Sequence, residues 1–216
     1  MSESFGPLQG VKVVSCSTAQ AGTVPWMLMA DLGADVIKVE NPEGGDDTRA
    51  WGPPFVEGAD GENLSAAYYH STNRNKRSIA VDLKTPEGQE TVRRLCASAD
   101  VVIENFKRGG LEKYGLDYES LKAINPKLVY CSITGFGQNG PYADFAGYDY
   151  IVQGMSGFMS ITGEKDGEPM KAGVAIADIF TGIYAVTAIQ AALIHVMKTG
   201  QGQFVDMALL DVMSAV

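Results

Sequence analysis

The hydrophobic positions of this chain fall into short apolar runs that alternate with longer amphipathic stretches. Val11–Cys16 is rich in valine and is typical of a strand buried on both faces of a parallel sheet. Thr23–Gly33 has a helical pattern in which Gly33 is placed to end the helix. Asp35–Glu40 is a second apolar run, so the start of the chain predicts a strand, a helix and a strand in a βαβ unit.

The alternation continues beyond an irregular segment, residues 41–63, that is rich in glycine and proline. The pattern predicts strands at Ser78–Leu83, Asp100–Asn105 and Lys127–Gly135, and helices at Thr85–Ala99, Tyr118–Ile124, Tyr150–Met159 and Ile176–Met197. Strands that alternate with helices are typical of the α/β class. We therefore predict an open, mostly parallel sheet with helices on both faces.

The composition narrows the choice of partners. The chain has 216 residues, 45% of them hydrophobic, which is enough for one sizeable core, and its formal net charge is −9. An acidic surface repels nucleic acid and anionic lipid, so we expect neither as a partner. The long apolar stretch Ile176–Met197 is interrupted by polar residues, and a buried helix explains it better than a membrane span.

The cysteines indicate the compartment. Cys16, Cys96 and Cys131 lie in or beside apolar runs, and their spacing matches no metal or redox motif. The first ten residues hold no apolar signal core. We expect reduced thiols, a cytoplasmic protein and no metal site.

A dinucleotide site would suit a βαβ unit that ends in Glu40, but the loop does not fit. Such a site needs G-x-G-x-x-G after the first strand. Here the loop reads SCSTAQAG and holds the single glycine Gly22. We therefore do not expect NAD.

Asp178 stands at the front of the longest apolar stretch. Taken alone it is best explained as a helix N-cap, and His195 near the other end as a residue that favours the helix dipole. By the same reasoning NRNKRS, Asn73–Ser78, is a solvated basic turn, and Glu104–Phe106 is a turn after a strand.

Taken together these features point to a ligand site. The carboxyl ends of parallel strands are where α/β proteins bind ligands. Basic side chains that would suit phosphate groups stand out on an acidic protein: Arg74, Lys76, Arg77, Lys84, Lys107, Arg108 and Lys113. This pattern favours an anionic cofactor, with Arg77 among its contacts.

Motifs along the whole chain resemble those of the class III CoA-transferases, the CaiB/BaiF family that includes formyl-CoA transferase and carnitine CoA-transferase. They include LGADVIKVE, NRNKRSI, ADVVIENF, SITGFGQNGPY, AGYD and TGQGQ, in that order. Family members are longer. The resemblance implies that residues 1–216 form the Rossmann-like part of the large domain, without the smaller domain and the returning C-terminal segment, and that the full protein is an interlocked homodimer.

The resemblance also implies catalytic roles. Asp178 matches the aspartate that attacks the thioester of an acyl-CoA, which gives an aspartyl anhydride and then an aspartyl-CoA thioester. Gln20, together with Ala19, matches the first-strand loop beside the thioester, and Tyr148 matches an active-site tyrosine. Such intermediates require that water be excluded.

Contacts with coenzyme A are implied in the same way. Val81 and Lys84 match contacts to the nucleotide, Asn105 and Phe106 match contacts to the pantetheine arm, and Lys113 falls at a position that is often basic. Two positions depart from formyl-CoA transferase: Asn41 replaces an arginine and Ala146 replaces a lysine.

Two other functions remain open from the sequence. The α-methylacyl-CoA racemases share the fold but use a histidine in an AGHD-like motif, where this chain has AGYD with Tyr148. A tyrosine with a pKa near 10 is a poor base at neutral pH, which favours transfer. The third possibility is an inactive CoA-binding fragment. Among acceptors, a small dicarboxylic acid such as succinate is expected by analogy.

Overall fold

The sheet has the strand order of doubly wound nucleotide-binding folds. A computed structural model describes residues 6–216. The first five of the ten N-terminal residues, in which the sequence showed no apolar signal core, lie outside the described residues. The sheet consists of β1 (Lys12–Cys16), β2 (Asp35–Glu40), β5 (Arg77–Ala80), β6 (Val101–Glu104), β7 (Val129–Thr134) and β8 (Phe204–Ala208). Every pairing is parallel, in the order β5-β2-β1-β6-β7-β8. The predicted parallel α/β sheet is confirmed.

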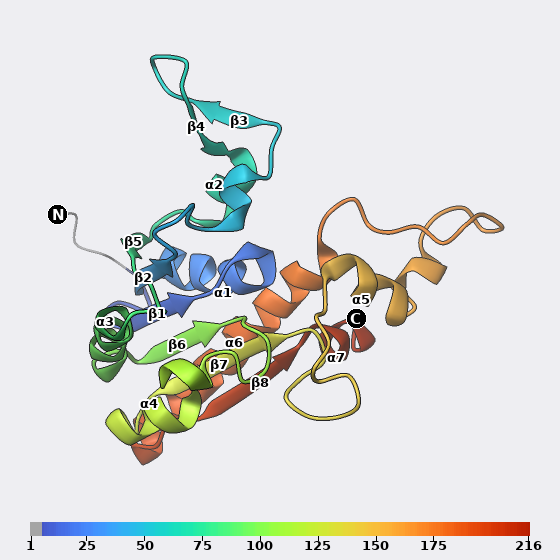
Figure 1. The fold of residues 1–216 in the computed structure, drawn as a ribbon. Coiled ribbons are helices and arrows are strands. Elements are labelled where there is room, and N and C mark those ends of the chain that lie inside the picture. The colour runs from blue at the N-terminus through green and yellow to red at the C-terminus, as the bar shows by residue number, and fades with distance from the viewer. Residues whose placement is uncertain (1–5) are drawn as a thin grey trace.

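Helices cover both faces of the sheet (Figure 1). One face packs against α1 (Ala19–Asp31), α5 (Asp149–Met155), α6 (Ile176–Thr199) and α7 (Leu209–Ser214), and the other against α3 (Pro86–Ala97) and α4 (Tyr118–Ile124). Alternate strand residues supply the two cores, since Val13 belongs to the first and Val14 to the second. The sheet is therefore buried on both sides, as its continuous apolar runs predicted.

Helix α1 begins earlier than the sequence pattern indicates. The prediction started it at Thr23, yet the helix begins at Ala19, which places Pro25 in its second turn. A turn with positive φ at Ala19 redirects the chain directly after β1. The sequence has no glycine at this turn, and a positive φ is expected mainly at glycine, so the predicted start of α1 was too late.

The segment after β2 is not wholly irregular. It contains the 3-10 turn η1 (Asp47–Ala50) and an antiparallel hairpin of β3 (Phe55–Glu57) and β4 (Asn63–Ala66), followed by α2 (Ala67–Thr72). Figure 1 shows this hairpin as an arm that projects away from the sheet. A buried ion pair between Lys38 and Asp46 anchors its base to β2.

Helix α6 is a core helix on one face only. Ala177, Ala185 and Ile189 are fully buried in the main core, while Ile194 and Met197 are 51% and 79% exposed. By length and composition α6 is apolar enough to cross a membrane, a test that core helices of other proteins also pass. The prediction of a buried helix is thus correct for the face of α6 that packs on the sheet, and wrong for the face that bears Ile194 and Met197.

Candidate active site

A cavity of about 520 Å³ opens at the carboxyl ends of β1, β6 and β7. Its walls come from the loops after these strands, from α2 and α5, and from the segment before α6. Among the residues predicted from the sequence it brings together Ala19, Asn105, Phe106, Tyr148 and Asp178. It lies beside the boundary between β1 and β6, where the strand order reverses and where doubly wound sheets bind ligands.

Asp178 is not the cap of its helix. It is the third residue of α6, and the cap is supplied by Asp149 from α5. The carboxylate of Asp149 accepts hydrogen bonds from the backbone N–H groups of Ala177 and Asp178, at 2.8 and 3.1 Å. Because Asp149 satisfies these amides, the Asp178 side chain is left to line the cavity.

The surroundings of Asp178 favour its neutral form. Burial, and then the nearby charge of Asp149, raise the pKa of Asp178 to about 7, while the backbone N–H of Ala21 acts in the opposite direction. An ordinary aspartate is fully ionised at neutral pH. Here ionised and protonated forms coexist at neutral pH, which makes the group a candidate for chemistry.

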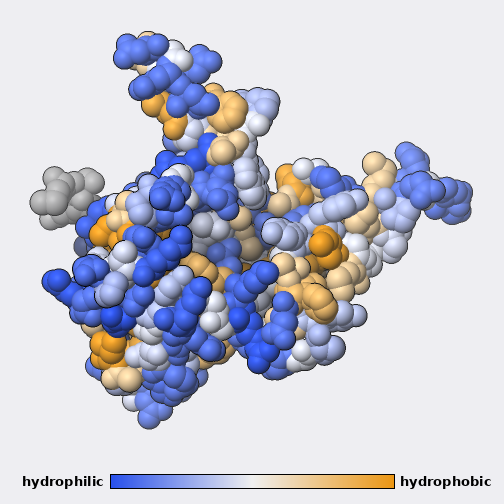
Figure 2. Space-filling model, viewed as in Figure 1, coloured by the Kyte–Doolittle hydropathy of each residue, from blue (hydrophilic) through white to orange (hydrophobic). Residues whose placement is uncertain are grey.

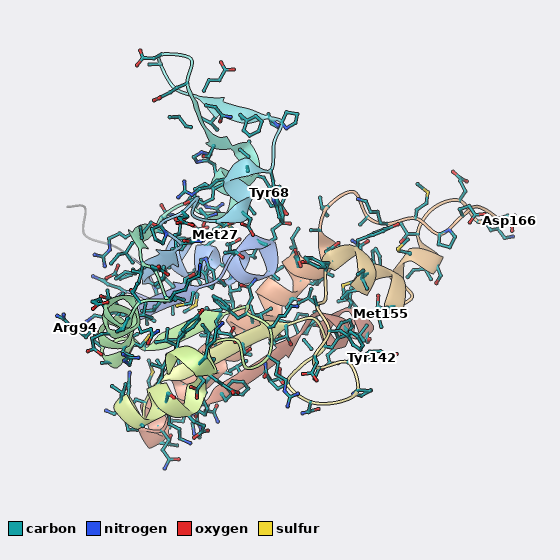
Figure 3. The ribbon with its side chains drawn as sticks, in the orientation of Figure 1. Met27, Tyr68, Arg94, Tyr142, Met155 and Asp166 are labelled. Atoms are coloured by element: carbon teal, nitrogen blue, oxygen red, sulfur yellow. The ribbon has the colours of Figure 1, made fainter. Side chains whose placement is uncertain are left out.

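Gln20 is held by a residue that the sequence did not single out. The hydroxyl of Tyr68 donates to Oε1 of Gln20 at 2.6 Å, and Tyr68 itself lines the cavity. Burial and the charge of Asp178 raise the pKa of Tyr68 to about 12, so it remains a donor. Figure 3 shows Tyr68 on α2 at the foot of the projecting arm. Tyr68 lies beyond the irregular segment of residues 41–63, in a stretch where the sequence predicted neither an element nor a motif.

A second, smaller cavity of about 200 Å³ adjoins the first. Its walls include Val81 and Lys84, both predicted as nucleotide contacts, and Asn41, where the sequence departs from formyl-CoA transferase. Thr18 and Phe106 line both cavities, so the two cavities adjoin. Both lie at the carboxyl ends of strands of the sheet.

Tyr148 lines the larger cavity, whereas Lys113 lines neither cavity. The Nζ of Lys113 lies 4.8 Å from the ring centre of Tyr114, which is a wall residue of the smaller cavity. Tyr148 is 68% exposed and immediately precedes α5. Figure 2 shows hydrophobic side chains gathered over α5 and the segment after it.

The basic turn after α2 does not reach the cavities. Arg74 pairs with Asp31 at 2.6 Å, and Arg77 pairs with Asp35 at 2.7 Å. Asp35 and Arg77 are the first residues of β2 and β5. They lie at the amino ends of the strands, whereas the cavities open at the carboxyl ends. Arg77 therefore lines neither cavity, contrary to the prediction that it contacts the cofactor.

Lys76 was predicted to be solvated, but its side chain is largely buried. Its Nζ is buried and donates to backbone carbonyls of α1 and α2, at 3.2 and 2.6 Å. Burial lowers the pKa of Lys76 to about 6. Lys76 therefore joins two helices. The cations that do line the larger cavity are Lys107, Arg108 and Lys171.

Residues 8–216 match the family model described as CoA-transferase family III. The chain belongs to this family. The resemblance stated from the motifs is thus confirmed, and so is the fold class. A crystal structure of a CaiB/BaiF family protein from Brucella suis superposes with a TM-score of 0.93 at 66% identity, over 98% of this chain and 55% of that one.

Curated relatives of family III carry related names. Succinate--glutarate CoA-transferase of Agrobacterium fabrum is 77% identical over 210 residues, which cover 97% of this chain and 52% of the relative. Succinyl-CoA:glutarate CoA-transferase of Homo sapiens is 49% identical over 205 residues, which cover 95% and 45%. Succinyl-CoA:mesaconate CoA-transferase of Haloarcula hispanica is 43% identical over 218 residues, which cover 97% and 53%. The chain thus spans about half the length of these relatives.

Proposed function

We propose that the protein transfers coenzyme A from a dicarboxylic acyl-CoA, such as succinyl-CoA, to a second small dicarboxylic acid. The family membership and the names of relatives at 77% and 49% identity support this reaction class. The observation that carries the proposal is the position of Asp178. It lines the larger cavity, and Asp149 relieves it of any capping role.

The two adjoining cavities suggest where an acyl-CoA lies. In this proposal the nucleotide occupies the smaller cavity near Val81 and Lys84, and the thioester enters the larger one. The pantetheine arm passes Thr18 and Phe106, which line both cavities. The Lys84 ammonium is a suitable partner for a phosphate group of the nucleotide.

The chemistry that we propose is carried by the Asp178 carboxylate. It attacks the thioester carbonyl, the C–S bond breaks, and the products are an aspartyl anhydride and CoA thiolate. The thiolate attacks the aspartyl carbonyl, which releases the donor acid and leaves an aspartyl-CoA thioester. The acceptor carboxylate attacks that thioester and expels the thiolate again. The thiolate then attacks the acceptor's carbonyl in the new anhydride, which releases the product acyl-CoA and regenerates Asp178.

The wall of the larger cavity suits a substrate with two carboxylates. One carboxylate of the acceptor must face Asp178, so the second needs a cation elsewhere in the cavity. Lys107, Arg108 and Lys171 supply such cations. Arg108 already pairs with Asp144 at 3.0 Å, which leaves the two lysines as the stronger candidates.

Transfer can be tested with the protein as its gene encodes it. Succinyl-CoA and glutarate should yield glutaryl-CoA, and Asp178→Asn should lower turnover by at least about a thousandfold, because the nucleophile is lost while CoA binding is kept. Asp166→Asn is the matched control. Asp166 is exposed and lies at the tip of a projecting loop (Figure 3), so this variant should keep wild-type turnover.

Two results would contradict the proposal. Wild-type turnover by Asp178→Asn would remove the assigned nucleophile. Exchange of the α-hydrogen of an acyl-CoA for deuterium, without transfer to any added acid, would instead favour racemisation. Homodimerisation and a cytoplasmic location remain expectations that size-exclusion chromatography and fractionation would check.

A further inference from the structure

The first residue of α1 has a left-handed backbone. The φ angle of Ala19 is +57°, a region that residues with a Cβ atom rarely adopt. The chain passes through this conformation on its way from β1 into α1. A non-glycine residue stays in such a conformation only when neighbouring contacts hold it there.

One side chain holds the peptide that precedes Ala19. The backbone N–H of Thr18 donates to Oδ1 of Asn105 at 3.0 Å, and Nδ2 of Asn105 donates to the carbonyl oxygen of Thr18 at 2.7 Å. That carbonyl belongs to the peptide bond between Thr18 and Ala19, whose orientation sets φ of Ala19. The carboxamide of Asn105, on the loop after β6, therefore fixes the turn after β1.

The first turn of α1 is shaped to receive this side chain. A Cβ atom at Gly22 would lie 2.9 Å from Nδ2 of Asn105 and 2.5 Å from Oγ of Ser17. Only a glycine lets the carboxamide approach so closely. Gly22, which is too isolated to form a dinucleotide loop, thus has a packing role.

The turn that Asn105 holds also faces the reacting carboxylate. The Ala21 N–H lies in the first turn of α1, where it has no partner within the helix, and it lowers the pKa of Asp178. Gln20, the residue between Ala19 and Ala21, is bound by Tyr68. A displaced first turn would move both residues relative to Asp178.

We propose that Asn105 is a positioning residue whose carboxamide holds the Thr18–Ala19 peptide, and with it the first turn of α1, against the Asp178 carboxylate. This inference rests on the proposed function, because it assigns Asn105 a part in presenting that carboxylate. A residue that only contacted the pantetheine arm would need no such pair of hydrogen bonds within the protein.

The test is the pH dependence of transfer by Asn105→Ala in the protein as its gene encodes it. We expect kcat to fall at least about tenfold, while KM for succinyl-CoA changes less than about twofold. The acid limb of the kcat profile should move to higher pH, because the Ala21 N–H no longer stabilises the ionised Asp178. The other ionisable groups that line the larger cavity are unchanged in the variant: Asp47, Tyr68, Lys107, Arg108, Tyr148, Asp149, Tyr150 and Lys171.

A second substitution should rescue the first. Glycine adopts positive φ without strain. Adding Ala19→Gly to Asn105→Ala should therefore raise kcat at least about threefold above the kcat of Asn105→Ala alone. If Asn105→Ala alone does not fold, the double variant is compared with Ala19→Gly, and a smaller shift of the acid limb in the same direction is expected.

Asn125→Ala is the matched control. Nδ2 of Asn125 donates to the carbonyls of Cys96 and Ala99, at 3.2 and 2.8 Å, and so joins the end of α4 to the end of α3, outside both cavities. This variant should lose thermal stability and keep the wild-type acid limb.

Two outcomes would overturn the inference. One is a raised KM for succinyl-CoA with kcat and the acid limb unchanged, which would make Asn105 a substrate contact. The other is an absence of rescue by Ala19→Gly. Failure of the proposed function gives a different result, namely wild-type turnover by Asp178→Asn.

Discussion

At the scale of single residues, the site depends on two aspartates with different roles. The carboxylate of Asp149 accepts hydrogen bonds from backbone N–H groups in the first turn of α6, so the Asp178 side chain does not cap the helix. The charge of Asp149 also helps to keep Asp178 partly protonated. The sequence pattern drew attention to Asp178, and the resemblance implied a catalytic role for it. Neither could assign the cap to Asp149, because that contact joins residues 29 positions apart and depends on how α5 docks beside α6.

A carboxylate with a raised pKa destabilises the fold when it ionises. An unfolded chain ionises an aspartate near pH 4, whereas folded Asp178 ionises near pH 7, so its favourable contribution is present at acid pH and is lost as pH rises toward about 7. We therefore expect Asp178→Asn to melt at a higher temperature than wild type at pH 8.

Differential scanning calorimetry at several pH values checks this prediction. The difference in melting temperature should shrink steadily between pH 7 and pH 4. A variant that melts below wild type at pH 8, or a difference that does not depend on pH, would contradict the assigned pKa.

At the scale of elements, the strands buried on both faces were the easiest to predict. The strand Asp35–Glu40 has the bounds that the sequence indicated, and so does the helix Tyr118–Ile124. β8 was missed because it is an edge strand with an alternating burial pattern, and it follows a glycine-rich turn. The hairpin of β3 and β4 was missed because short strands among glycines and prolines have no clear periodicity.

The contact between α1 and α6 is predicted to be sensitive to one glycine. A Cβ atom at Gly182 would lie 2.7 Å from Cγ1 of Val24 and 3.3 Å from Cδ of Pro25. We expect Gly182→Ala to destabilise the fold by about 1–3 kcal/mol, since two buried helices must separate. Turnover should also fall, because Asp178 lies one turn earlier on α6.

Gly154→Ala in α5 is the control for that change. Its Cβ atom would meet only the sulfur of Met159, at 3.6 Å, which is an ordinary contact. The substitution should leave stability unchanged or raise it by up to about 1 kcal/mol through helix propensity. Urea denaturation of both variants measures the difference, and equal effects would contradict the close helix contact.

At the scale of the whole molecule, the site lies where the strand order reverses. The loop after β1 and the loop after β6 come from neighbouring strands on either side of that point, and Asn105 joins them. The sequence could predict that strand ends would converge there, because parallel strands share one edge. It could not predict that Tyr68 would reach the same edge from an arm that leaves the sheet after β2.

The central claim is that Asp178 carries CoA as a covalent thioester, and trapping that species tests it most directly. The protein is incubated with succinyl-CoA, quenched with hydroxylamine, digested and analysed by mass spectrometry. We predict a hydroxamate on Asp178 that requires the acyl-CoA and does not form with free CoA. Turnover in the same sample without any modification of Asp178 would contradict the account.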